Sequence, residues 1–153
     1  MSFLYAVIVM LLIATGAYAN SGSYGTRFGN VTEHDGVQYE VYARVNPNES
    51  MMFEASIGQG RLDYVIDGIP VTDVNQTPIN GVLAFKLPSK SFTPYVGAGA
   101  SVIFSEYRKT FGSPIIQAGF ELPIFEKSYL LFDYRHQFNQ KTKYWFGGVG
   151  VKF

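Results

Sequence analysis

The 153-residue chain has no cysteine, no excess of either charge and only one long apolar run. Without cysteine it can have no disulfide, thiolate metal ligand or cysteine nucleophile. Twelve basic residues balance twelve acidic ones, whereas nucleic-acid binding requires a basic surface that displaces counterions. We therefore expect no nucleic-acid partner, and the length favours a single domain.

The one long apolar run covers residues 3–14. It is shorter than the ~20 residues that a transmembrane helix needs, but it fits the apolar core of a secretory signal peptide. Ala17-Tyr18-Ala19 then supplies a small-x-small cleavage pattern. We predict a cleaved signal peptide over residues 1–19 and a mature domain over 20–153. Since no Lys or Arg precedes the run, an uncleaved anchor and a buried segment remain alternatives.

Aromatic residues and glycine are plentiful, and apolar and polar residues alternate with a period of two, which is the pattern of strands with two different faces. The unequal connections include a long loop over 60–78 and a medium loop over 106–113, as is typical of bacterial barrels. We therefore predict an all-β, eight-stranded, antiparallel up-and-down transmembrane β-barrel. The predicted strands are 23–32, 37–46, 51–59, 79–87, 93–105, 114–122, 129–138 and 143–153.

The polar faces of these strands carry four acidic and four basic side chains, interleaved with glycines. An eight-stranded barrel is just wide enough inside for side chains, so we predict that these charges pair with one another there. A polar interior also leads us to expect that Gly99→Ser is milder than Ala100→Arg on the lipid side. The predicted interior charge network is Glu40, Arg44, Glu54, Lys86, Glu121, Asp133, Arg135 and Lys152.

The apolar faces carry large aromatic residues near the strand ends, among them Trp145 and Phe153. Aromatic residues are enriched at the two interfaces of a membrane, so we predict that these two lie there. A soluble, lipocalin-like barrel has the same alternation, with these aromatics in its core. The signal peptide and the C-terminal Phe favour the membrane barrel.

The C-terminal strand resembles the terminal strand of bacterial outer-membrane barrels. Gly148, Val151 and Phe153 match that pattern, while Phe146 replaces its polar residue. The stretch 93–100 (Thr-Pro-Tyr-Val-Gly-Ala-Gly-Ala) resembles a middle strand of the OmpA-like and OmpX-like eight-stranded barrels. The resemblance implies a monomer in the bacterial outer membrane that contacts its lipids and is inserted by the barrel-assembly machinery through the C-terminal strand.

Some small barrels of this class are enzymes that modify lipid A, so the two histidines need examination. The deacylases have a His-x-Ser in a late strand, whereas His136 is followed by Gln137 and Phe138. The palmitoyltransferases combine a His with an Asp-Ser pair, and no Asp-Ser accompanies His34. We predict no catalytic residue, no cofactor and no metal site.

The leading functional hypothesis is a non-enzymatic surface barrel, either structural or binding a partner through its outer loops. The predicted loop 60–78 contains apolar stretches at 64–66 and 69–71. It either extends the strands above the membrane and binds a surface partner, or folds back over the barrel mouth. A lipid A deacylase or acyltransferase and a narrow, porin-like pore are the alternatives.

Overall fold

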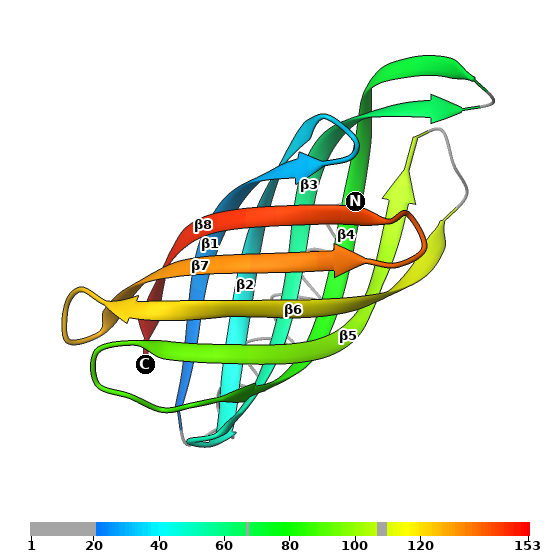
Figure 1. Ribbon diagram of the computed structural model, residues 1–153. Helices are drawn as coiled ribbons and strands as arrows, with labels where there is room; N and C mark the ends of the chain where they lie inside the picture. Colours follow the sequence, from blue (N-terminus) through cyan, green and yellow to red (C-terminus); the bar gives the residue numbers. More distant parts are fainter. Residues whose placement is uncertain (1–20, 67, 107–109) are drawn as a thin grey trace.

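The chain folds into a closed barrel of eight antiparallel strands, in which each strand pairs with its chain neighbours and β1 pairs with β8 (Figure 1). This computed structural model describes residues 21–66, 68–106 and 110–153, so the predicted signal peptide lies outside it. No helix in the described part of the chain is long and apolar enough to cross a membrane. The strands are β1 (Ser21–Thr32), β2 (Gly36–Asn48), β3 (Met51–Ile66), β4 (Ile69–Lys86), β5 (Thr93–Ser105), β6 (Phe111–Pro123), β7 (Ser128–Gln137) and β8 (Thr142–Lys152).

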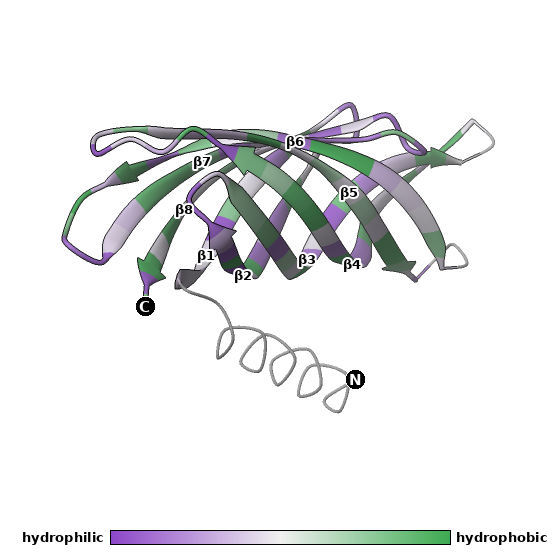
Figure 2. Cartoon of the chain, turned by 90° about the horizontal axis from the view of Figure 1, so that it is seen from below, coloured by the Kyte–Doolittle hydropathy of each residue, from purple (hydrophilic) through white to green (hydrophobic). Residues whose placement is uncertain are grey.

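Alternation along the strands separates an inner from an outer surface. In β2, for example, Gln38, Glu40 and Arg44 are buried, whereas Tyr39 and Val41 between them are exposed. Figure 2 shows this alternation as bands of hydrophilic and hydrophobic colour along the strands. The predicted eight-stranded barrel and its alternating faces are therefore confirmed.

The two ends of the barrel differ in their connections. Both termini of the described chain lie at one end, together with the turns 49–50, 87–92 and 124–127; we call it the termini end. The opposite, loop end carries the connections 33–35, 106–110 and 138–141 and the tip of the β3–β4 hairpin. An even number of strands produces this arrangement, because every second connection returns to the same end.

The predicted long loop over 60–78 is wrong. β3 continues to Ile66 and β4 begins at Ile69, and these two residues pair, so the segment forms two long strands. The register shifts between Leu62 and Tyr64, and Asp73 opposite this shift has a positive φ of 57°. This irregularity breaks the period of two, which explains why alternation alone did not predict the extension.

Several inward-facing glycines allow neighbouring strands to approach closely. A Cβ atom on Gly99 would overlap the carbonyl oxygen of Gly81 in β4, and one on Gly148 would overlap the carbonyl oxygen of Thr26 in β1. Such glycines are typical of places where a barrel wall bends sharply. A serine at Gly99 would therefore force the backbone to move, and the expectation that Gly99→Ser is milder than Ala100→Arg stays a prediction.

The interior is not uniformly polar. An inner cluster towards the termini end combines three tyrosines with aliphatic side chains: Tyr42, Met52, Val82, Ala84, Tyr95, Ile115, Tyr129 and Leu131. A cap cluster lies at the loop end: Val31, Leu62, Tyr64, Val74, Tyr144 and Phe146. Parts of β3, β4, β6 and β7 are apolar on both faces, so alternation of polarity did not assign these residues to the interior.

Candidate functional site

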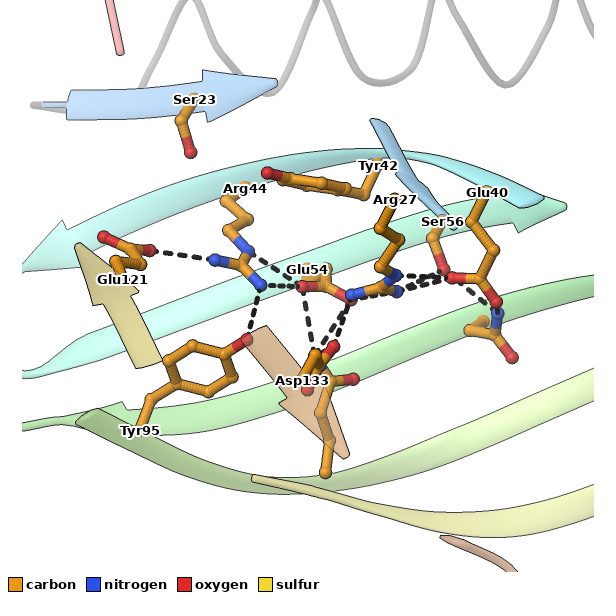
Figure 3. Close-up of polar contacts among 12 residues, drawn as sticks. Ser23, Arg27, Glu40, Tyr42, Arg44, Glu54, Ser56, Tyr95, Glu121 and Asp133 are labelled. Carbon is orange, nitrogen blue, oxygen red and sulfur yellow. Dashed lines mark hydrogen bonds and ion pairs between the residues drawn. The ribbon is translucent and has the colours of Figure 1, made fainter. Parts of the chain in front are cut away.

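The centre of the barrel interior is Arg27, a β1 residue that the sequence analysis missed. Its buried guanidinium contacts three carboxylates, at nitrogen–oxygen distances of 2.6 Å to Glu40, 2.7 Å to Glu54 and 2.6 Å to Asp133 (Figure 3). A guanidinium has five N–H donors, enough for several acceptors at once. Arg27 therefore separates three acidic groups that would otherwise repel one another.

Arg44 of β2 extends this network towards the termini end. It contacts Glu54 at 2.6 Å and Glu121 at 2.8 Å, and it donates to the hydroxyl of Tyr95 at 3.0 Å. Its guanidinium carbon lies 4.8 Å from the ring centroids of both Tyr42 and Tyr95. The aromatic faces thus stabilise a cation that carboxylates also neutralise.

Arg135 of β7 completes the network on the opposite wall. It contacts Glu40 Oε1 at 2.7 Å and donates to the side-chain oxygen of Gln117 at 3.2 Å. The amide nitrogen of Gln117 in turn donates to Asp133 at 2.9 Å. These carboxylates are already bound by arginines, so the arrangement favours a structural role over acid–base chemistry.

Two predicted members of the network lie at its edge. Lys86 Nζ is 3.8 Å from Glu121 Oε1, and Lys152 Nζ is 3.8 Å from Glu121 Oε2. The Lys152 side chain remains 45% exposed at the termini end, whereas those of the three arginines are fully buried. The structure thus brings Glu40, Arg44, Glu54, Glu121, Asp133 and Arg135 together, and it places the two lysines at the rim.

The loop end of the interior is closed by the cap cluster. Below it, Gln76 donates to the side-chain oxygen of Gln38 at 3.2 Å, and the Tyr144 hydroxyl donates to Gln137 at 3.0 Å. On the outer side of the cluster, the Tyr64 ring packs on the His34 ring, and the two ring centroids are 4.7 Å apart. The Gln76 amide also donates to the Tyr144 hydroxyl at 3.4 Å, so side chains of β4 and β8 meet across the barrel at this level.

The β3–β4 hairpin reaches beyond the other connections at the loop end, at the upper right of Figure 1. Tyr64 at its base is buried in the cap cluster, but Val65 is 67% exposed and Ile69 is 65% exposed. Pro70 has no N–H group, and such residues protect exposed strand edges from unwanted pairing. The hairpin thus presents exposed apolar side chains to solvent more than a free backbone edge.

Trp145 and Phe153 lie on the outer surface, near opposite ends of β8. The Trp145 ring packs on Tyr134 at 4.7 Å, and the Phe153 ring stacks on Tyr24 at 6.2 Å. Both are more than half exposed, although a soluble protein buries such rings. Their positions suit the two interfaces of a membrane.

Neither histidine lies in a site suited to catalysis. His136 lies on the outer surface with its ring 4.8 Å from that of Phe138, and its pairing partner across the strands is Lys143. His34 packs on Tyr64, and its Nε2 lies 3.3 Å from the Gln140 carbonyl oxygen. Among the described residues there is no cluster of three or more His, Asp or Glu that could hold a metal ion.

One exposed ion pair links the turn after β1 to the start of β8 at the loop end. Lys143 Nζ, at the start of β8, lies 2.5 Å from Glu33 Oε1 in the turn after β1. The hydrogen bond from Lys143 lowers the pKa of Glu33, and the same bond raises the pKa of Lys143. Because both groups are in solvent, the pair contributes little to stability.

No protein-family model and no curated protein matches the sequence. Solved structures do match the fold. The N-terminal β-barrel domain of Pseudomonas aeruginosa OprF is similar. It has a TM-score of 0.69 at 15% identity, over 88% of this chain and 98% of the OprF domain. Neisserial surface protein A has a TM-score of 0.68 at 16% identity, over 87% of this chain and 96% of its own chain. The outer membrane protein OprG from Pseudomonas aeruginosa has a TM-score of 0.68 at 12% identity, over 88% of this chain and 96% of the OprG chain. The chain therefore has the fold of small bacterial outer-membrane barrels.

Proposed function

We propose that this chain is a non-enzymatic barrel of the bacterial outer membrane that presents its β3–β4 hairpin to a partner at the cell surface. The hairpin carries the proposal, because it combines a buried anchor at Tyr64 with exposed Val65 and Ile69 at the tip. Its base is fixed to the barrel, and its tip extends beyond the other connections. The apolar outer surface and the likeness to outer-membrane barrels support the location.

The filled interior argues against the two alternative functions. A lipid A-modifying enzyme needs a free nucleophile or base, whereas the central carboxylates are bound by Arg27, Arg44 and Arg135. A pore needs an open passage, whereas the ion pairs and the cap cluster join opposite walls. Mass spectrometry of lipid A with and without expression tests the first alternative, and conductance in planar bilayers tests the second.

The absence of cysteine allows a direct test of the orientation. Ile69→Cys places a thiol on the hairpin, and Ser89→Cys places one in an exposed turn at the termini end. A membrane-impermeant maleimide should label the first variant on intact cells and the second only after permeabilisation. The reverse pattern would invert the orientation and remove the hairpin from the cell surface.

Partner binding is tested by a photo-crosslinking amino acid at Val65, with Lys141 as the control position. Both residues are exposed at the loop end, but Lys141 belongs to the β7–β8 connection. We expect a crosslinked adduct from Val65 and none from Lys141. If neither position gives one, the hairpin does not bind a partner, and the structural role alone remains.

We further propose that the monomer is inserted by the barrel-assembly machinery through its C-terminal strand. Phe153 directly follows β8, and its backbone N–H donates to the Gly22 carbonyl oxygen at 3.0 Å. Phe153→Ala should therefore reduce the amount of inserted barrel, measured as the fraction that resists unfolding in unheated detergent samples. Wild-type insertion of this variant would contradict the proposed recognition.

A further inference from the structure

The termini end of the interior contains a polar cavity of about 450 Å³. Lys86 of β4 and Lys152 of β8 approach it from different strands, and Glu121 lines it between them. Ser23 and Asn46 add hydroxyl and amide groups. None of the residues predicted from the sequence had suggested a cavity at this end.

The two lysine ammonium groups retain most of their hydrogen-bonding capacity. Lys86 Nζ donates to the Asn46 side-chain oxygen at 3.3 Å, and Lys152 Nζ makes no hydrogen bond to any described residue. Both are 3.8 Å from a Glu121 oxygen, which is too far for a hydrogen bond. Each ammonium group has three donors, so an acceptor placed between them would find several free N–H groups.

Glu121 does not neutralise both lysines, because Arg44 also binds it. Arg44 donates to Glu121 Oε1 at 2.8 Å, so three cations surround one buried carboxylate. Among the described residues, the only other titratable group that lines the cavity is Glu49, an exposed residue of the β2–β3 turn. In the inner part of the cavity, Lys86 and Lys152 therefore exceed Glu121 by one positive charge, since Arg44 is also paired with Glu54.

We propose that this cavity binds a phosphate group between Lys86 and Lys152. A phosphate has several acceptor oxygens pointing in different directions, which suits donors that approach from two strands. A planar carboxylate offers only two oxygens and satisfies fewer of them. The cavity lies at the rim, so the phosphate group belongs either to a small soluble molecule or to the headgroup of a lipid in the same leaflet.

Inorganic phosphate is the first probe, added to the full-length protein in detergent at constant ionic strength. Chemical shifts of the backbone amides report its binding, and we expect changes at Ser23, Asn46 and Glu121 but not at the loop end. Lys152→Gln should weaken binding by about fivefold, the size of a single exposed charge contact. Glu49→Gln should tighten it by about twofold, because an opposing charge is removed.

Lys90→Gln is the matched control, since Lys90 is exposed at the same end but does not line the cavity. It makes the same change in net charge and should leave the affinity unchanged. Equal weakening by Lys90→Gln and Lys152→Gln would mean general attraction by the surface and would overturn the site. Resistance to unfolding in unheated detergent samples verifies that each variant is folded.

Two lipid environments distinguish the sources of the phosphate group. In nanodiscs of zwitterionic phosphatidylcholine, in which choline balances the charge of the headgroup phosphate, inorganic phosphate should shift the same amides as in detergent. If phosphatidylglycerol shifts these amides and prevents a further response to phosphate, the headgroup occupies the site. No change at the cavity with either probe would overturn the proposal.

Discussion

Neighbouring residues along a strand face opposite surfaces of the barrel wall, and the two surfaces carry different kinds of side chain. On β5, Ala100 faces outward and is exposed, whereas Ser101 faces inward and accepts a hydrogen bond from Gln137 at 3.3 Å. Inside, charged groups find partners across a narrow space. On the outer surface, a charged side chain would face the membrane and find no such partner. A charged side chain is therefore stable in the barrel wall where the fold brings an opposite charge within hydrogen-bond distance.

Removing the central cation should have the largest effect. Arg27→Met leaves Glu40, Glu54 and Asp133 buried together with less compensation, and breaking a buried ion pair costs about 3–5 kcal/mol. Urea unfolding of the barrel in lipid vesicles measures this loss. Arg61→Met is the control, because Arg61 is exposed on the hairpin, and it should be close to neutral. Equal losses would show that the buried network does not stabilise the interior.

Placing a charge on the outer surface should have the next largest effect. Ala100→Arg exposes a cation to hydrocarbon, which costs about 2–4 kcal/mol near the middle of a membrane barrel. Ala100→Leu keeps the surface apolar and is the control. The same unfolding measurement in vesicles compares them. Cooperative folding of the protein to a monomer in plain buffer would contradict the membrane location itself.

A methyl group added at Gly99 should reveal how closely the strands approach inside. Its Cβ would overlap the backbone of Gly81, so Gly99→Ala should cost about 1–3 kcal/mol, as overpacking does. Gly81→Ala is the matched control, because a Cβ there meets nothing within 4 Å. If the two variants were equally stable in urea, the close approach at Gly99 would be disproved.

The smallest effect is expected at the rim. Lys152→Ala removes a half-exposed cation 3.8 Å from Glu121 and should cost less than about 1 kcal/mol, as exposed ion pairs do. The urea midpoint should therefore shift little, although the same position should change phosphate binding. A loss as large as that of Arg27→Met would mean that Lys152 belongs to the buried network.

The sequence predicted the strand number and the alternating faces because period-two alternation is a direct property of strand geometry. It predicted the strand 23–32 but did not assign its two faces, because glycines at positions 22, 25 and 29 leave few side chains to alternate. Arg27 was missed for this reason, although Tyr24 and Phe28 carry the outward half of the pattern and are more than half exposed. Which carboxylates one arginine would contact depends on the strand register, which alternation does not determine.

The sequence predicted the hairpin only as one of two alternatives and did not predict the cavity, for different reasons. Pro70, Asp73 and Gly68 are common turn residues, and the register shift at Asp73 disrupts the alternation of β4. The cavity depends on Lys86 and Lys152 meeting across the barrel, and only the closed sheet brings β4 and β8 to the same mouth.

The pairing of β1 with β8 also has a consequence for how the barrel folds. Ser23 pairs with Lys152, so this contact joins two strands that lie far apart along the chain. Contacts between residues so distant in sequence form slowly, because a long loop must close before they are gained. Until β1 and β8 pair, each keeps an unpaired edge that other chains can join. This one pairing therefore removes the last edges at which the protein could aggregate.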